Sequence, residues 1–231
     1  FKQKTAYESK QGAKVIGLRS AVASQALMVR PQSDHYYPSS LANKPIAVQF
    51  HAGSHYTALR LLEGYIPSEK IKLLHYGSPR YRFEALMSGE VDAAMLMEPW
   101  IALAEKNGCR AVCEGHYLGA ENASDNMDEE TFAAINRAVS KAVDLINSDK
   151  KRFIHYLIDQ PKFAPVAAEW GGLTADDFHL PRLRYAYPRP YTEEQLEDTY
   201  NWMVRWELLN ASVCATDFVD NRESEPVAAD G

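Results

Sequence analysis

The sequence has few cysteines, no long apolar segment and fewer basic than acidic residues. Its 231 residues include 3 cysteines, and this odd number does not match a disulfide framework. No apolar segment approaches the ~20 residues that cross a bilayer, so we expect no membrane insertion. Lys and Arg total 25 against 31 Asp and Glu, which gives a formal net charge of -6. This balance argues against a nucleic-acid surface, because such a surface requires clustered basic side chains.

Motifs for several kinds of chemistry are also missing. The chain has no Gly-rich phosphate loop and no Ser-His-Asp order of the kind found in hydrolases. Cys109 and Cys113 are four residues apart with no further Cys or His in register, which is a poor pattern for zinc. We interpret these cysteines as buried free thiols, and we expect no metal and no cofactor.

A strand, a turn and a helix are predicted between residues 44 and 65. The apolar run 46–50 predicts a short buried strand, Gly53 permits a tight turn, and Ser54 is a good N-cap residue. Apolar residues then recur at helical spacing, at Ala58, Leu59, Leu61, Leu62 and Tyr65. The turn places backbone N–H groups, a hydroxyl and two imidazoles at a helix N-terminus, which suits an anion or a polar ligand group.

Strand and helix patterns continue to alternate after this unit. The strand patterns lie at 70–75, 91–97 and 109–114, and the helix patterns at 80–88 and 100–106. This alternation predicts right-handed crossovers and a mainly parallel α/β sheet. In such a sheet, ligands bind outside the carboxyl ends of the strands. We expect one cleft lined by the turns at those ends, at residues 51–56, 77–82 and 98–100.

The same residues resemble a known protein family. The segment "IPSEKIKLLHYGSPRYRFEALMSGEVDAAMLMEPW", followed by "AEKNGCRAVCEG", looks like the second lobe of type II periplasmic-binding-protein-like proteins. Within that family the sequence is most similar to nitrate, sulfonate and taurine solute-binding proteins and to thiamine-pyrimidine synthases. The phrase "ALMSGEVDAAMLMEPW" is the most specific part of the resemblance, which covers about residues 13–160. The cysteine-rich run of the thiamine-pyrimidine branch is absent here, which argues against that activity.

The resemblance implies two lobes with mainly parallel sheets. It assigns residues 1–30 to a first-lobe fragment and a crossover, and residues 31–118 to the second lobe. Residues 119–216 are expected to form the return crossover and the helical part of the first lobe, and 217–231 a flexible tail. The opening strands and helices of the first lobe have no counterpart before Lys44, so the N-terminal part of that lobe is expected to be absent. A second polypeptide or an upstream segment would complete it.

Five candidate ligand residues lie at the first turn: His51, Gly53, Ser54, His55 and Tyr56. Histidine titrates near neutral pH, so His51 or His55 could bind a ligand or act as a catalytic acid or base. The alternative is a pair of solvent-exposed histidines beside a helix start. Ser54 and Tyr56 could donate hydrogen bonds to the same ligand, or serve as cap and packing residues.

Three further candidates follow later strands. Arg80 suits a carboxylate, sulfonate or sulfinate, although a solvated helix start explains it equally well. Glu98 ends a buried strand, where an acid is either a structural acceptor or a cleft residue with a raised pKa. Trp100 could stack on a flat ligand or pack within the lobe.

Two functions of different classes remain open from the sequence. The first is a binding module for a small organic ligand, anionic or heteroaromatic, held between two lobes as part of an ABC-type uptake system. The second is a cytosolic enzyme subunit on the same fold, a lyase or hydrolase of the decarboxylase or desulfinase type. It would use His51 or His55 as acid or base. The first function places the protein in the periplasm and the second in the cytoplasm.

Overall fold

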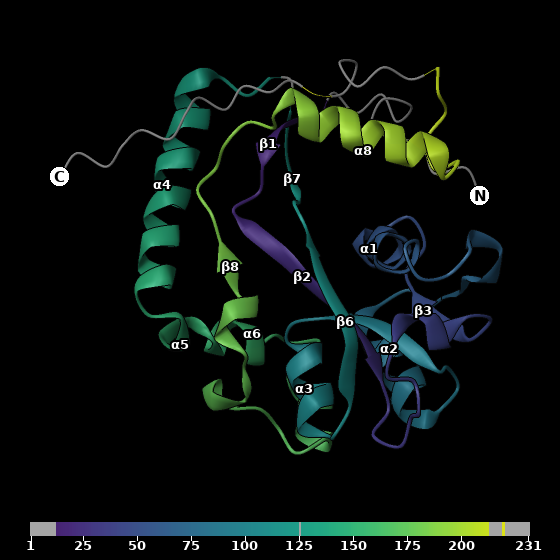
Figure 1. Cartoon of the computed structure of the whole chain (residues 1–231). Coiled ribbons are helices and arrows are strands. Elements are labelled where there is room, and N and C mark those ends of the chain that lie inside the picture. Colours follow the sequence, from purple (N-terminus) through teal and green to yellow (C-terminus); the bar gives the residue numbers. More distant parts are fainter. Residues whose placement is uncertain (1–12, 125, 213–218, 220–231) are drawn as a thin grey trace. The chain divides into compact units, whose positions relative to one another are not determined.

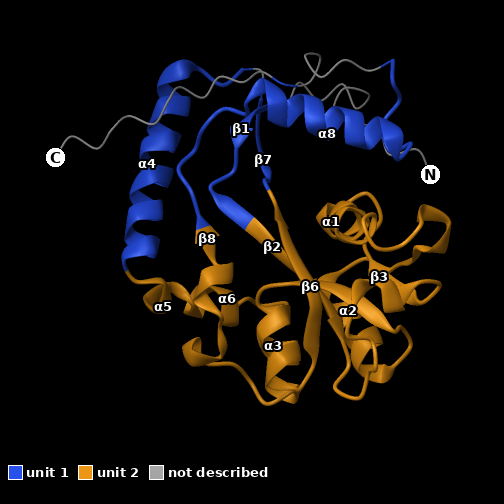
Figure 2. Cartoon of the chain, viewed as in Figure 1, with its two compact units in different colours: residues 1–22, 118–148, 185–231 blue, residues 23–117, 149–184 orange. Residues whose placement is uncertain are grey.

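The computed structural model describes residues 13–124, 126–212 and 219, and Figure 1 labels their helices and strands where there is room. The chain divides into two compact units, coloured in Figure 2. Unit 1 comprises residues 1–22, 118–148 and 185–231, and unit 2 comprises residues 23–117 and 149–184. The helical stretch expected at residues 2–11 lies outside the described residues, as does the expected tail at 217–231 apart from Val219.

Unit 2 contains a sheet whose main path has the order β4-β3-β5-β2-β6. Strand β3 pairs in parallel with β4 and β5, whereas β2 runs antiparallel to both β5 and β6. Four of these strands therefore share one direction, which confirms a mainly parallel sheet. The strand bounds are β2 (Ala21–Val29), β3 (Pro45–Val48), β4 (Lys72–His75), β5 (Ala93–Met97) and β6 (Arg110–Tyr117).

Helix α1 (Gly53–Leu62) follows β3, as the sequence predicts, but it begins differently. Its N-cap residue is Ala52, which makes no side-chain cap bond. Ser54 lies inside the first turn, buried, and its Oγ accepts a hydrogen bond from the Gln49 N–H at 2.9 Å. The prediction of Ser54 as the N-cap was therefore wrong, because its hydroxyl closes the preceding loop. Gly53 is required by packing, since a Cβ there would lie 2.4 Å from the Tyr117 ring.

Two more helices start and stop where local sequence signals place them. Helix α2 (Pro79–Ser88) begins after Ser78, whose side chain accepts from the Tyr81 N–H, and it ends at Gly89 in the left-handed conformation with φ 81°. Helix α3 (Trp100–Lys106) has the range that the sequence predicts, and Pro99 is its N-cap residue. Two short 3₁₀ helices, η1 (Pro38–Leu41) and η2 (Ser68–Lys70), precede β3 and β4.

Both faces of the unit 2 sheet are covered. On one face Ala58 and Leu62 of α1 pack with side chains of β2, β3 and β5: Leu27, Val29, Ile46, Val48, Ala93 and Met95. On the other face α2 and α3 pack against the alternate residues of the same strands: Ala26, Met28, Ala47, Ala94 and Leu96. This alternation follows from the two-residue period of a strand, and it gives unit 2 two buried cores.

The segment 149–184 also belongs to unit 2. Phe163 and Val166 are buried in the core under α2 and α3, and Lys106 of α3 pairs with Asp177 at 3.0 Å. Residues 119–216, expected to form the return crossover and the helical part of the first lobe, are thus divided between the two units. The segment contains α5 (Lys150–Phe153), α6 (His155–Ile158), α7 (Ala164–Glu169), η3 (Ala175–Asp177) and η4 (Leu180–Arg182). It ends in β8 (Arg184–Tyr185), where the chain enters unit 1.

Unit 1 is smaller in its described part. Strands β1 (Ala13–Leu18) and β7 (Ala120–Ser124) form a two-stranded antiparallel sheet. The unit also contains helices α4 (Glu129–Ser148) and α8 (Glu193–Arg205), and a capping box at Thr192 starts α8. Its buried cluster consists of Ile16, Ala123 and Phe132. No helix in the described ranges is long and apolar enough to span a membrane.

Candidate functional site

Three turns follow the carboxyl ends of β4, β3 and β5 along one edge of the unit 2 sheet, because these strands are adjacent and parallel. The Tyr76 N–H donates to the Val48 carbonyl at 2.7 Å, which joins the turns after β4 and β3. The buried Arg82 donates through Nε to the Met95 carbonyl at 2.7 Å and through Nη1 to the Tyr76 carbonyl at 3.4 Å. Arg82 therefore braces the strand ends and is not available as a ligand residue.

The turn after β3 is built around His51. This residue adopts a left-handed backbone conformation with φ 59°, which costs a non-glycine residue about 1–3 kcal/mol. In this conformation its backbone N–H donates to Nδ1 of His55 at 3.2 Å. The two imidazole rings meet edge to face with their centroids 5.7 Å apart. The strained turn thus fixes the orientation of the His55 ring at the start of α1.

His75, at the end of β4, is held in the same way. The Phe50 backbone N–H donates to Nδ1 of His75 at 3.1 Å. The Phe50 ring is close to both imidazoles, with its centroid 5.2 Å from that of His55 and 5.4 Å from that of His75. The sequence interpretation did not select His75. The signal that could have found it was its place at the end of the strand next to β3.

These backbone bonds determine which ring nitrogen carries the proton. A nitrogen that accepts a hydrogen bond has no proton, so a neutral His55 carries its proton on Nε2 and offers an N–H donor. Burial, followed by the proximity of His51, lowers the pKa of His55 to about 4, so the neutral form dominates near neutral pH. In the same way, the bond from the Phe50 N–H to Nδ1 leaves the proton of a neutral His75 on Nε2, which provides a second N–H donor.

The other predicted residues of this turn surround the histidines. Gly53 and Ser54 form the first turn of α1, and Ser54 is buried and bonded to Gln49. The Tyr56 ring contacts the His55 ring at a centroid distance of 5.4 Å, and burial raises the pKa of its hydroxyl. The structure therefore brings His51, Gly53, Ser54, His55 and Tyr56 together, as the sequence predicts.

Arg80 lies on the first turn of α2 and is already paired. Its Nε donates to Glu84 at 2.7 Å, one helical turn later, and both side chains are substantially exposed. An exposed pair of this spacing is weak and opens readily. The solvated helix start, which was the alternative for Arg80, agrees with this placement.

Glu98 and Trp100 lie apart from the histidine turn. Helix α1 covers one face of the sheet, whereas Trp100 is buried on the opposite face between the rings of Phe83 and Phe163. The Glu98 carboxylate accepts from the Ala102 N–H of α3 at 3.1 Å, on that same opposite side. This corrects the expectation that all three turns form one group, and it places Trp100 in the core.

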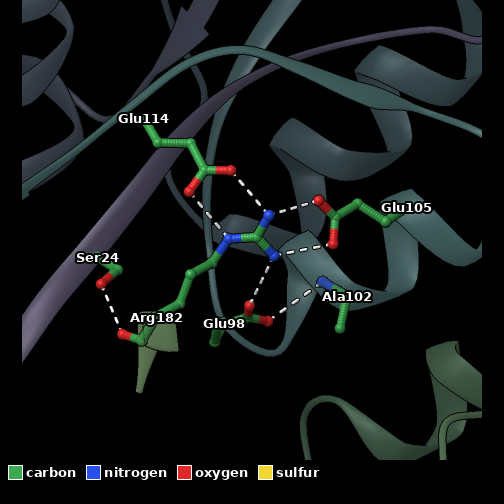
Figure 3. Close-up of polar contacts among 6 residues, drawn as sticks. All are labelled: Ser24, Glu98, Ala102, Glu105, Glu114 and Arg182. Carbon is green, nitrogen blue, oxygen red and sulfur yellow. Dashed lines mark hydrogen bonds and ion pairs between the residues drawn. The ribbon is translucent and has the colours of Figure 1, made fainter. Parts of the chain in front are cut away.

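Glu98 instead belongs to a cluster around Arg182, drawn in Figure 3. The Arg182 guanidinium donates to Glu105 on α3 at 2.5 and 2.8 Å, and to Glu114 on β6 at 2.7 and 3.0 Å. It also contacts Glu98 at 3.4 Å. Burial raises the pKa of Glu98 to about 7 although Arg182 opposes this shift, while the hydrogen bond from Arg182 lowers the pKa of Glu114. The sequence interpretation missed Arg182, because its partners are 68 to 84 residues away.

Neither metal nor thiol chemistry is supported by the described part of the chain. It contains no group of three or more His, Cys, Asp or Glu placed to hold a metal ion. The Nε2–H tautomers fixed at His55 and His75 also lack the lone pair that a metal would need there. Burial raises the pKa of the Cys109 and Cys113 thiols to about 11, which suppresses the reactive thiolate. Cys214 lies outside the described residues.

No protein-family model and no curated protein matches the sequence. Solved structures do match. SsuA from Xanthomonas axonopodis pv. citri, an alkanesulfonate-binding protein bound to MOPS, superposes with a TM-score of 0.71 at 20% identity, covering 93% of this chain and 75% of that one. The periplasmic aliphatic sulphonate-binding protein SsuA from Escherichia coli gives 0.69 at 18% identity, covering 91% and 74%.

The chain has the type II periplasmic-binding-protein fold. The resemblance seen in the sequence is therefore confirmed at the level of the fold. An enzyme shares the likeness: the desulfurization enzyme DszB superposes with a TM-score of 0.57 at 19% identity, covering 92% of this chain and 78% of the enzyme. Likenesses of such low identity show the fold alone.

Proposed function

We propose that the chain binds a small organic anion at the carboxyl edge of the unit 2 sheet, as the solute-binding component of an ABC-type uptake system. The observation that carries this proposal is the bond from the His51 N–H to Nδ1 of His55. Because Nδ1 is occupied, neutral His55 has one remaining hydrogen-bonding group on its ring, an Nε2–H donor, at the N-terminus of α1. A donor at the positive end of a helix dipole suits a negatively charged group.

Sulfonates and sulfinates fit this arrangement because they carry several acceptor oxygens and one negative charge. His75 supplies a second N–H of the same kind, and the Phe50 ring, close to both imidazoles, adds an apolar surface. Among the similar structures, three are sulfonate-binding proteins by their description, and a DszB mutant is in complex with biphenyl-2-sulfinic acid. These neighbours support an anionic ligand without naming it.

The enzyme alternative is supported less well by the same geometry. A general base needs a free lone pair near neutral pH, and His55 has none because Nδ1 accepts from the backbone and Nε2 is protonated. The buried Cys109 and Cys113 thiols are poor nucleophiles for the reason given above. His51 remains the one candidate acid or base of the two that the sequence suggested, and a desulfinase-type reaction would depend on it.

Binding can be tested with a charged and a neutral probe of similar shape. By titration calorimetry, we expect the full chain to bind butane-1-sulfonate more tightly than butyl methyl sulfone, which has no charge. His55→Ala should weaken sulfonate binding by roughly tenfold or more, the value of a hydrogen bond to a charged group. The matched control is His155→Ala, an exposed histidine on α6, which should leave binding unchanged.

The outcomes separate the two classes. For a binding protein, His51→Ala and His55→Ala change affinity alone, and wild type forms no product from sulfonates or sulfinates. For an enzyme, His51→Ala would lower the turnover rate by roughly a hundredfold or more, while the affinity for substrate remained unchanged. Equal binding of the two probes by wild type would contradict an anion site at this edge.

We also propose that a further α/β segment completes unit 1. The support comes from the described part of unit 1, where α4 packs on a two-stranded sheet through the small cluster of Ile16, Ala123 and Phe132 and leaves Ile135 and Leu145 exposed. Expressed by itself, the 231-residue chain should aggregate or copurify with a second chain. A monodisperse monomer of 26.0 kDa that melts cooperatively would argue against this proposal.

A further inference from the structure

The chain passes between unit 1 and unit 2 at four points, after residues 22, 117, 148 and 184. In the type II fold, such crossings are the segments about which lobes open and close. Three of the four have a residue of the Arg182 cluster close by on the unit 2 side: Ser24 near the first, Glu114 near the second and Arg182 itself near the fourth. All residues of the cluster lie within unit 2.

The bonds of Arg182 connect these three crossings directly. The Ser24 hydroxyl donates to the Arg182 carbonyl at 2.7 Å, so β2 is tied to the last crossing through the main chain. Arg182 Nε and Nη2 both donate to the Glu114 carboxylate, at 3.0 and 2.7 Å, so β6 is tied to the same residue. Glu105 receives a second two-bonded contact, from Nη1 at 2.8 Å and Nη2 at 2.5 Å, which anchors the residue to α3 (Figure 3).

The guanidinium uses its full donor capacity in this cluster. Arginine has five N–H donors in a rigid plane, and Arg182 makes five contacts to Glu98, Glu105 and Glu114. The side chains of Arg182 and Glu98 are 9% and 6% exposed, so water competes little for these bonds. Lysine has the same charge but no planar fork, and it cannot hold two carboxylates in two-bonded geometry.

We infer that Arg182 is a positioning residue that locks three of the four crossings between the units into one rigid node, so that they move together when the lobes open or close. The geometry explains why a single residue suffices. Its guanidinium bonds to β6 and α3, its main-chain carbonyl accepts from Ser24 of β2, and its main chain leads into β8 at the last crossing. The inference concerns the crossings alone, and it does not depend on which ligand the protein binds.

Amide hydrogen exchange on the full chain tests this inference without any ligand. In Arg182→Lys, we expect amides at residues 23–25, 114–117 and 182–184 to exchange faster together, by roughly tenfold or more, while β3 and β5 keep their protection. The matched control is Lys106→Met, which removes another tie between α3 and the same segment but touches no crossing. In that variant, exchange at the three crossings should stay at the wild-type rate.

Two results would overturn the inference. One is unchanged exchange at all three crossings in Arg182→Lys, and the other is faster exchange confined to residues 182–184. If Arg182→Lys loses protection throughout unit 2, the Ser24→Ala variant provides the test instead. This variant removes one hydroxyl and leaves the guanidinium bonds in place. The node predicts that residues 23–25 and 182–184 then loosen together. Wild-type exchange at both segments in Ser24→Ala contradicts it.

Discussion

The two units of this chain differ in how much apolar surface they bury. Unit 2 has a sheet covered on both faces, and its larger core holds fully buried Phe83, Leu86, Leu96 and Ile101. Unit 1, in its described part, has a two-stranded sheet and the cluster of Ile16, Ala123 and Phe132. Large side chains on α4 stay exposed, with Ile135 at 42% and Leu145 at 58%. In the described residues, unit 2 therefore buries more apolar surface than unit 1.

The largest consequence is a difference in local stability. We expect amides in β3 and β5 of unit 2 to exchange roughly a thousandfold more slowly than amides in β1 and β7 of unit 1, because local opening depends on buried apolar contacts. Hydrogen exchange with mass spectrometry on the full chain measures both in one sample. Equal protection in the two units would mean that unit 1 is stabilised as fully as unit 2.

A pair of truncations sharpens the same comparison. Phe83→Ala should lower the free energy of unfolding of unit 2 by about 3–5 kcal/mol, since Phe83 is fully buried against Trp100 and Trp170. Leu145→Ala in α4 should change stability by no more than about 0.5 kcal/mol, as for other exposed side chains. Chemical denaturation measures both variants. A loss of several kcal/mol in Leu145→Ala would show that α4 is covered by a partner.

The start of α1 offers a smaller effect with an internal control. Gly53→Ala places a Cβ against the Tyr117 ring and should cost about 1–3 kcal/mol by overpacking. Tyr117→Ala removes the obstructing ring. Adding Gly53→Ala to the Tyr117→Ala variant should therefore lower the free energy of unfolding little further. A thermal or denaturant double-mutant cycle tests this coupling. Additive costs in the double variant would place the strain elsewhere.

The smallest effect is a dependence of stability on pH. Burial raises the pKa of Glu98 to about 7, above its ordinary value of 4.5, so the folded chain holds this proton more tightly than the unfolded chain. The free energy of unfolding contributed by Glu98 therefore falls as pH rises from about 4.5 to about 7. The pKa of His55 is lowered from 6.5 to about 4, so the free energy of unfolding contributed by His55 rises with pH between these two values.

Glu98→Gln isolates the carboxyl group from the histidine. This variant keeps a side chain of similar shape but cannot titrate, so only the rise due to His55 should remain between pH 4.5 and 6.5. The difference in stability between wild type and variant should therefore change steadily across this range. A difference that is constant with pH would show that Glu98 titrates at its ordinary value.

The sequence predicted the elements of unit 2 well because their signals are local. The strand at 46–50 and the helices at 80–88 and 100–106 are predicted from neighbouring residues, and the structure has β3, α2 and α3 at these places. The predicted group at the α1 turn also formed, since its members lie within one helical turn of each other. Local signals fail at the cap of α1, where the Ser54 hydroxyl is used by the preceding loop.

Other features depend on contacts that sequence spacing does not record. Helices α1 and α3 cover opposite faces of the sheet, and this determines the face on which Glu98 and Trp100 lie. The position of a residue at the end of a strand does not indicate which face its side chain takes. Segment 149–184 has amphipathic helices that fit either lobe, and its place in unit 2 follows from Phe163 and Val166. The role of Arg182 depends on three carboxylates distant in sequence.

The central claim is that the carboxyl edge of unit 2 offers imidazole N–H donors to an anion. Long-range nitrogen–proton correlation spectra of the histidine rings at pH 7.5, with and without butane-1-sulfonate, test it most directly. The account predicts that His55 is neutral with its proton on Nε2, and that the Nε2–H resonance shifts on addition of the sulfonate but not of butyl methyl sulfone. A proton on Nδ1 of His55, or a resonance unaffected by saturating sulfonate, would contradict it.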